Sequence, residues 1–450
     1  MRKRILLLGT LGFVGWTSFG IAAEAPNERE AFLGDPVALP VEWNLDQLKT
    51  LAVEHNPTIR QAREKVAEWH GVHIATLSAG LPELEASGEY TQQDPGLIES
   101  FGPDGFQPDD VTWKTGLQLN MTVYSAGRLS ARLEAEDHRY QAIRSAIRST
   151  VHDVLLEVSE AWLAAELAQE QRSVQDEAFK VLDQQVVWTA HRVEAGAANK
   201  LALLQAKVAR ENVRPAQLRA GNDYRLAIDR LRRLVGLPLG EAVALEQIRL
   251  KPMADKQPPV PPLKKALARA QVRRPELAES NRLLDAAYAE LRLAQKGNKP
   301  TVGIFGGYGY HGTQFSDASY LDGWNAGVQA KWSLWDGGLT KGRVKEAESM
   351  IRQQVLARNG LRSKIQGDVR AAWYNWQVAT EIGKTTEATI AQAEEAYRLA
   401  KARQEAGGAT QLDVLQSQLE VTRAQLESVT ARHDVRLAQA RLRHATGLLP

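Results

Sequence analysis

The 450-residue sequence contains no cysteine. This absence excludes disulfide bonds, thiolate metal ligands, cysteine nucleophiles and a lipid anchor attached through an N-terminal cysteine. Beyond residue 23 no run of 18 or more apolar residues occurs, so the sequence offers no segment typical of a membrane-spanning helix. An excess of charge of one sign is missing too, because 56 basic residues face 54 acidic ones. We therefore expect no nucleic-acid partner.

The first 23 residues have the pattern of a secretory signal peptide. Arg2-Lys3-Arg4 gives a positive start, residues 5–19 are mostly apolar, and Ala22-Ala23 offers small residues for cleavage. Removal of residues 1–23 takes away three positive charges and leaves a formal charge of −1. We expect an exported, nearly neutral protein; the alternative interpretation is a retained N-terminal anchor.

Proline is missing from two long windows, one after Pro108 and one after Pro300. Because proline disrupts helix interiors, long helices are permitted there. Helix-forming residues fill both windows, and apolar residues recur at three- and four-residue steps. The pattern predicts helices over about 129–193 and 341–404, far longer than the usual 11–12 residues. Each is followed by a Glu-Ala-Gly turn and a second helical pattern, which predicts two long hairpins.

These elements occur twice because the chain is internally duplicated. Adding 211 to Trp113 gives Trp324, and the same offset relates the long helices and the turns near 196 and 407. Upstream the offset is 218, which relates Pro57 to Pro275. We divide the chain into a signal peptide (1–23), a first repeat (24–236), a proline-rich linker (237–262) and a second repeat (263–450).

Alternation of apolar and polar residues predicts four strands, over 82–92, 112–124, 300–311 and 324–335. Their length and two-faced pattern suit membrane strands, although a half-buried sheet of a soluble protein is the alternative. The apolar positions, which we expect to face lipid, include Leu117, Leu119, Met121, Val328, Ala330 and Trp332. The polar positions, which we expect to face an aqueous lumen, include Gln118, Asn120, Gln329 and Lys331.

Four strands are too few to close a barrel, and an open sheet edge is not viable in lipid. The strands would therefore have to come from several chains. Two chains would give a barrel filled by side chains, and three would give twelve strands around a pore. The small, polar residues of the inward face favour three.

Several motifs occur in order and in duplicate. They are Asn56-Pro57 and Arg274-Pro275, Ala161-Trp162 and Ala372-Trp373, the junction Trp332 to Gly338, and the tip Glu405-Ala406-Gly407 with Leu412-Asp413-Val414-Leu415. With these motifs the chain resembles the TolC-type outer-membrane efflux protein family. The resemblance implies a mainly α fold with a membrane β-barrel. In that fold a homotrimer joins a 12-stranded barrel in the outer membrane to a long α-helical barrel crossing the periplasm.

The resemblance also implies a function and partners. It implies a passive exit duct of a tripartite efflux or type I secretion system, which docks through a periplasmic adaptor with an inner-membrane transporter. We expect the adaptor to dock at the small and apolar tip residues, Gly196, Ala197, Leu201, Gly407, Gly408 and Leu412. By resemblance Asp413 gates the periplasmic end, although an acid at this position equally suits a helix start.

The sequence contains no recognisable catalytic constellation. We expect no enzyme activity, no cofactor and no metal, since His70 and His73 lack a third ligand nearby in the sequence. Two other classes of protein are alternatives. A periplasmic coiled-coil structural or adaptor protein would not need the four alternating strands, and an exported hydrolase would need a catalytic site. The identity of the cargo is not encoded in any motif.

Overall fold

The computed structural model describes residues 42–94, 111–237, 249–251, 259–313 and 320–449. They belong to one compact unit that begins at Glu42, and the expected signal peptide lies outside the described residues. Within these ranges, no helix combines the length and apolar character needed to cross a membrane.

Helices dominate the described chain and repeat in two sets of four. The first set is α2 (Leu45–His55), α3 (Pro57–Ser78), α4 (Arg128–Glu194) and α5 (Lys200–Val235). The second set is α6 (Leu263–Arg273), α7 (Pro275–Gln295), α8 (Leu339–Glu405) and α9 (Gln411–Ala445). The two long helices, α4 and α8, have 67 residues each and begin and end within two residues of the predicted bounds.

Local sequence explains where the helices begin and end. Pro57 stands at the first turn of α3, and the Asn56 side chain accepts hydrogen bonds from the backbone N–H groups of Thr58 and Ile59. The long helices end before Gly196 and Gly407, whose φ values of +73° and +80° lie in the left-handed region that glycine adopts without strain.

The four strands β2 (Glu83–Gln92), β3 (Val111–Tyr124), β5 (Thr301–Gly312) and β6 (Tyr320–Lys331) form one antiparallel sheet in the order β2-β3-β5-β6. The two halves of the duplication thus meet at the β3–β5 pair. A second, two-stranded sheet pairs β1 (Glu42–Trp43) with β4 (Arg249–Leu250), which lies inside the predicted linker and was not anticipated.

The fourth strand differs from its prediction. It runs from Tyr320 to Lys331 rather than over 324–335. Lys331 lies opposite Thr301, the first residue of β5, so the residues after Lys331 have no strand to pair with. Trp332, predicted as a lipid-facing strand residue, instead follows the strand, and its indole N–H donates to the backbone oxygen of Asn298 at 3.1 Å.

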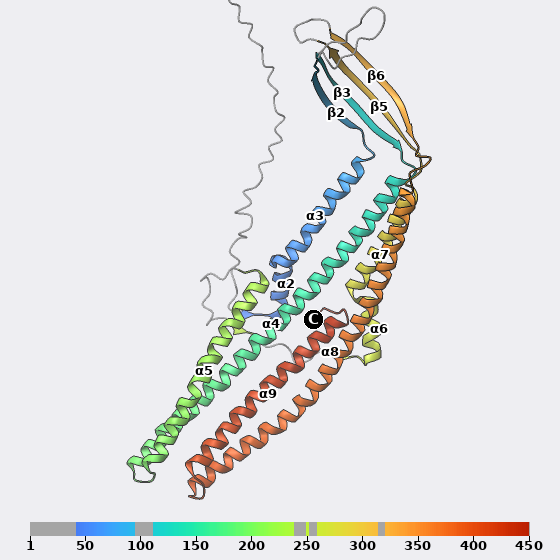
Figure 1. The fold of residues 1–450 in the computed structure, drawn as a ribbon. Helices are drawn as coiled ribbons and strands as arrows, with labels where there is room; N and C mark the ends of the chain where they lie inside the picture. Colours follow the sequence, from blue (N-terminus) through green and yellow to red (C-terminus); the bar gives the residue numbers. More distant parts are fainter. Residues whose placement is uncertain (1–41, 95–110, 238–248, 252–258, 314–319, 450) are drawn as a thin grey trace, which may run out of the picture. The chain divides into compact units, whose positions relative to one another are not determined.

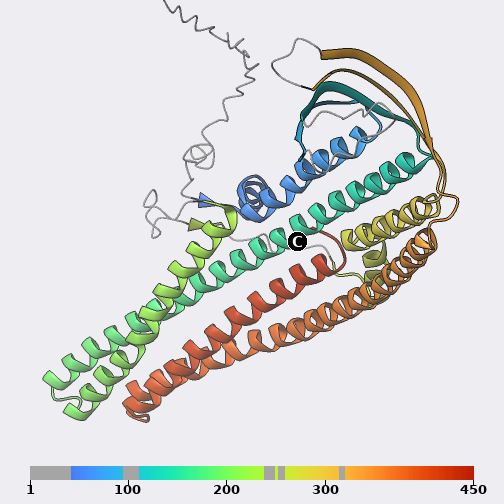
Figure 2. The ribbon, with the colours of Figure 1, turned by 45° about the horizontal axis from the view of Figure 1, so that its top comes forward.

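The helices pack as pairs around the long helices (Figures 1 and 2). α4 runs beside α5, α8 runs beside α9, and α4 also packs against α9. The shorter α7 packs against both α4 and α8, whereas α3 packs against α4. One core cluster joins α6, α7, α8 and α9 through Ala266, Ala270, Leu277, Ile365, Val369 and Ala445.

The C-terminal ends of the return helices meet the helix junctions of their own halves at glycines. Gly236 follows α5 with a φ of +78°, and a β-carbon placed on it would lie 2.3 Å from the backbone oxygen of His55. Gly447 follows α9 with a φ of +74°, and its β-carbon would lie 2.8 Å from the backbone carbon of Arg273. Both junctions therefore need glycine for conformation and for space.

We expect Gly236→Ala to destabilise the fold more than Gly196→Ala. Both glycines have positive φ, which costs an alanine about 1–2 kcal/mol, but no atom lies within 4 Å of a β-carbon at Gly196. The steric overlap at Gly236 should add about 1–3 kcal/mol. Chemical denaturation of the two purified variants measures the difference, and equal losses of stability would contradict the crowded junction.

Candidate channel wall and hairpin tips

The strand register gathers apolar side chains on one face of the four-stranded sheet. Leu119 lies opposite Leu84 on one side and Gly306 on the other, and Met121 lies opposite Ile304, which in turn lies opposite Val328. Side chains at paired and at alternate positions share a face. This face therefore carries the predicted lipid-facing residues that lie within strands, namely Leu117, Leu119, Met121, Val328 and Ala330.

The opposite face of the sheet is mostly polar or small. Gln118 lies opposite Gly307, which pairs with Asn325, and Asn120 lies opposite Phe305. The amide of Gln118 donates to the side-chain oxygen of Asn120 at 3.3 Å. This face carries the predicted lumen residues Gln118, Asn120, Gln329 and Lys331.

Strand β2 adds three carboxylates to the polar face that were not among the predicted site residues. Glu83 lies opposite Asn120, Glu85 opposite Gln118, and Glu89 opposite Lys114, with which it forms an ion pair at 2.7 Å. The alternation of glutamate with apolar residues in this strand was the available signal.

Aromatic side chains border the apolar face at both ends. Tyr310 packs edge-on against Tyr308 and Tyr320, with ring centroids 5.6 and 5.7 Å apart. Trp332 and Trp335 follow the other end of the sheet and are exposed. An apolar band between aromatic girdles is typical of sheets in an outer membrane.

The hairpin tips expose small residues in tight turns. The N–H of Ala197 donates to the oxygen of Arg192 at 2.8 Å, and that of Gly408 donates to the oxygen of Arg403 at 2.7 Å, so the two tips close in the same way. No atom lies within 4 Å of a β-carbon at Gly196 or Gly407. Leu201 and Leu412, the predicted apolar docking residues, are exposed beside these turns.

Close to the tips the two hairpins are joined by glutamine side chains, a feature that sequence reasoning missed. Gln185 of α4 donates to the side-chain oxygen of Gln411 at 3.4 Å, and Gln404 donates to the same oxygen at 2.6 Å. Gln404 and Gln411 are both buried. No periodicity distinguishes these glutamines from the many exposed ones.

Asp413, the predicted gate residue, starts α9 as part of a capping box. Its carboxylate accepts hydrogen bonds from the backbone N–H and the hydroxyl of Thr410, both at 2.8 Å, and its own N–H donates to the Thr410 hydroxyl. These bonds hold the pKa of Asp413 below its ordinary value of 3.8. The geometry therefore satisfies the helix-start interpretation while leaving the side chain exposed.

In the described residues, no group of three or more histidines, aspartates or glutamates is arranged to hold a metal ion. His70 and His73, which we did not expect to bind a metal, lie in an aromatic cluster. Trp69 stacks on His73 with ring centroids 4.8 Å apart and on Tyr140 of α4 at 4.1 Å.

A duplicated chain with two long hairpins and a two-faced antiparallel sheet defines the class of outer-membrane channel proteins. The family model described as "Outer membrane efflux protein" matches residues 48–237 and 266–448, and the chain belongs to this family. It is accordingly an efflux channel protein of the outer membrane and not an enzyme.

Similar proteins include two named relatives and one solved structure. The probable outer membrane lipoprotein SilC of Salmonella typhimurium is 24% identical, over 70% of this chain and 66% of SilC, so the match spans about two thirds of that relative. TolC of Vibrio cholerae is 24% identical over 90% of this chain and 91% of its own. The CmeC channel of Campylobacter jejuni superimposes with a TM-score of 0.75 at 16% identity, over 94% of this chain and 87% of that chain.

We expect Thr410→Ala to weaken the start of α9 at neutral pH, because Asp413 loses its hydroxyl partner. Ionised Asp413 has a lowered pKa, so the capping contribution is complete above 3.8 and is lost as the pH falls through the lowered pKa. Hydrogen exchange of the peptide that covers residues 411–415, corrected for intrinsic rates, should rise in the variant at pH 7. In the unsubstituted protein the exchange rate of this peptide should rise only when the pH falls below 3.8, the ordinary pKa of Asp413. Unchanged protection in Thr410→Ala would refute the cap.

Proposed function

We propose that three copies of this chain form one exit duct, closed in the outer membrane by twelve strands. Each copy has a sheet of four strands whose edge strands, β2 and β6, each pair on one side among the described residues. Eight strands would enclose only side chains, whereas a larger barrel leaves an aqueous lumen. The polar, glycine-rich face opposite the apolar band is the observation that supports the larger barrel.

In this proposal one face of the sheet contacts lipid and the other faces the aqueous lumen. Leu117, Leu119, Met121, Val328 and Ala330 contact lipid, and Trp332 lies just beyond the strand at the aromatic border. Gln118, Asn120, Gln329 and Lys331 line the lumen together with Glu83 and Glu85.

The long hairpins extend this duct into the periplasm, and their tips bind a periplasmic adaptor. The support is the pair of similar, open turns with exposed Leu201 and Leu412 nearby. Small residues at Gly196, Ala197, Gly407 and Gly408 let a partner helix approach the backbone closely. Through the adaptor the duct receives cargo from an inner-membrane transporter and passes it on without chemistry.

The register of the barrel can be tested with neighbouring substitutions. Leu119→Arg places a charge in lipid near the bilayer centre and should cost about 2–4 kcal/mol. Asn120→Arg places the same charge in water and should be far milder. The amount of assembled protein in outer-membrane fractions measures both, and equal losses would mean that the faces are assigned wrongly.

We further propose that Asp413 contributes a ring of carboxylates at the periplasmic entrance, in addition to capping α9. Such a ring in a narrow aqueous passage favours cations and binds multivalent ones. Asp413→Asn should reduce cation selectivity and weaken block by multivalent cations in single-channel recordings.

Thr410→Ala is the matched control, because it perturbs the same cap and keeps the carboxylate. Block that is weakened equally in both variants would mean that only the cap matters. Unchanged conductance and block in Asp413→Asn would move the gate elsewhere.

A further inference from the structure

The four connections between the large sheet and the helices meet at one end of the sheet (Figure 1). Because the strands are antiparallel, β2 and β5 begin at this end and β3 and β6 finish there. The ammonium group of Lys296 donates to the backbone oxygen of Gly127 at 2.9 Å, and the indole of Trp332 donates to that of Asn298. We define the junction band as residues 79–82, 125–128, 296–300 and 331–343.

The junction band carries charge almost entirely of one sign. Its one acidic residue, Asp336, accepts hydrogen bonds from the backbone N–H groups of Gly338 and Thr340 at 3.0 and 2.8 Å, and so caps the start of α8. Six basic residues give the band a formal charge of +5 (6 − 1). They are Arg128, Lys296, Lys299, Lys331, Lys341 and Arg343.

The opposite end of the sheet has the opposite charge. Its strand ends include Glu89, Asp94 and Asp322, and the basic residue among them is Lys114, which pairs with Glu89 at 2.7 Å. In the sequence, residues 89–114 and 310–322 together have eight acidic residues and one lysine. The sheet is therefore polar along its length, with its positive end next to the helices.

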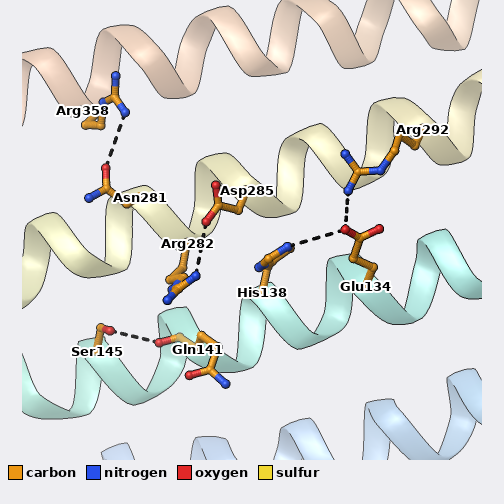
Figure 3. Close-up of polar contacts among 9 residues, drawn as sticks. All are labelled: Glu134, His138, Gln141, Ser145, Asn281, Arg282, Asp285, Arg292 and Arg358. Atoms are coloured by element: carbon orange, nitrogen blue, oxygen red, sulfur yellow. Dashed lines mark hydrogen bonds and ion pairs between the residues drawn. The ribbon is translucent and has the colours of Figure 1, made fainter.

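Charges are balanced again just beyond the band. Figure 3 shows Arg292 of α7 paired with Glu134 of α4 at 2.6 Å. Arg139 of α4 likewise pairs with Glu290 of α7. The helices thus satisfy their own charges where they pack against each other, and the excess of positive charge belongs to the junction band.

Three cations of the junction band are exposed and lack a carboxylate partner among the described residues, namely Lys299, Lys341 and Arg343. Lys299 directly follows Asn298, whose backbone oxygen holds the indole of Trp332. Lys341 and Arg343 are two positions apart on α8, which places them about 200° apart around the helix axis. One of these two therefore stays at the outer surface, whichever side of α8 faces the lumen.

Apolar side chains are exposed beside these cations. Leu334 and Trp335 are 81% and 87% exposed, and Trp332 follows the last residue of β6. Tryptophan is enriched where a membrane meets water, and lysine and arginine near such a border extend their charged groups into the headgroup layer. A ligand of this surface thus needs an anionic group and an apolar chain together.

We propose that the junction band binds anionic phospholipid in the periplasmic leaflet of the outer membrane. The headgroup phosphate pairs with Lys299 and with the outward cation of α8, while the acyl chains lie against Trp332 and the apolar face of the sheet. Clusters of basic residues next to a membrane-embedded segment attract anionic lipids in this way. The inference rests on the proposed lipid-facing side of the sheet and adds the class of lipid that it recognises.

The exposed tryptophans and leucine favour a lipid over a soluble phosphate. A free anion would be bound by the cations alone and would leave Leu334 and Trp335 in water, whereas a phospholipid covers them with its chains. The difference in charge between the two ends of the sheet also places this binding at one membrane surface only. The negative end would repel the same headgroups.

Native mass spectrometry of the full chain, purified in detergent and mixed with phosphatidylglycerol or phosphatidylcholine, tests the proposal. The unsubstituted protein should bind phosphatidylglycerol at least roughly threefold more tightly than phosphatidylcholine, because the cations favour the anionic headgroup. The triple variant Lys299→Gln, Lys341→Gln, Arg343→Gln should bind the two lipids equally. Added salt should reduce the preference of the unsubstituted protein, since it screens exposed charges.

Two controls match the triple variant. Lys299→Arg, Lys341→Arg, Arg343→Lys changes the same positions but keeps their charge, so it should keep the preference for phosphatidylglycerol. Lys331→Gln removes a cation of the band from the polar face of the sheet, and it should leave lipid binding unchanged. Glycerophosphoglycerol, the same headgroup without acyl chains, should not compete with the lipid at equal concentration.

The outcomes separate this inference from the proposed function. A triple variant that keeps the preference overturns the inference, and so does a triple variant that changes only the ion selectivity of the channel, because its cations would then face the lumen. Competition by glycerophosphoglycerol would mean that the surface binds a soluble anion. A monomer in light scattering, with the lipid preference intact and lost in the triple variant, overturns the trimer and leaves the lipid surface in place.

Discussion

The hydrogen-bonding groups at the two edges of the four-stranded sheet are the constraint on which this account depends. In lipid there is no water to satisfy them, so a sheet placed in a membrane must close on itself. Among the described residues the large sheet has four strands, and it presents an apolar face between aromatic borders. In the proposed trimer, closure comes from other copies of the chain.

Duplication gives the chain two long hairpins that are built in the same way. The long helices α4 and α8 have 67 residues each and end at equivalent turns. The two halves nevertheless differ in sequence at equivalent positions. Where α4 has Arg139 and Leu163, α8 has Met350 and Tyr374, so the two long helices carry different side chains at equivalent positions.

Much of the fold could be predicted because its signals are periodic. The helices from Arg128 and Leu339 needed only the absence of proline and a repeated apolar spacing, and three strands needed only alternation. The fourth strand was placed four residues too late, because alternation continues through Trp335 while pairing ends where β5 begins. Periodicity reports which faces a strand would have, not whether a partner exists.

The site was less predictable than the fold, because some of its contacts join distant elements and leave no periodic signal in the sequence. The faces of the sheet follow from alternation, so the sequence could group Leu119 with Met121 and Gln118 with Asn120. The buried glutamines Gln404 and Gln411 could not be found. Gln404 contacts Gln411 across the tip of their own hairpin, Gln185 reaches Gln411 from the other hairpin, and no local pattern relates these positions. Asp413 was recognised as a site residue. Only the structure shows that its carboxylate accepts a hydrogen bond from the Thr410 hydroxyl as part of the helix cap.

The most direct test of the central claim is to image the full-length protein in lipid nanodiscs by electron cryomicroscopy. The account predicts particles with threefold symmetry in which twelve strands surround an open lumen, with four strands from each copy. Monomers, dimers, or a sheet whose edges are closed by a different protein would contradict it.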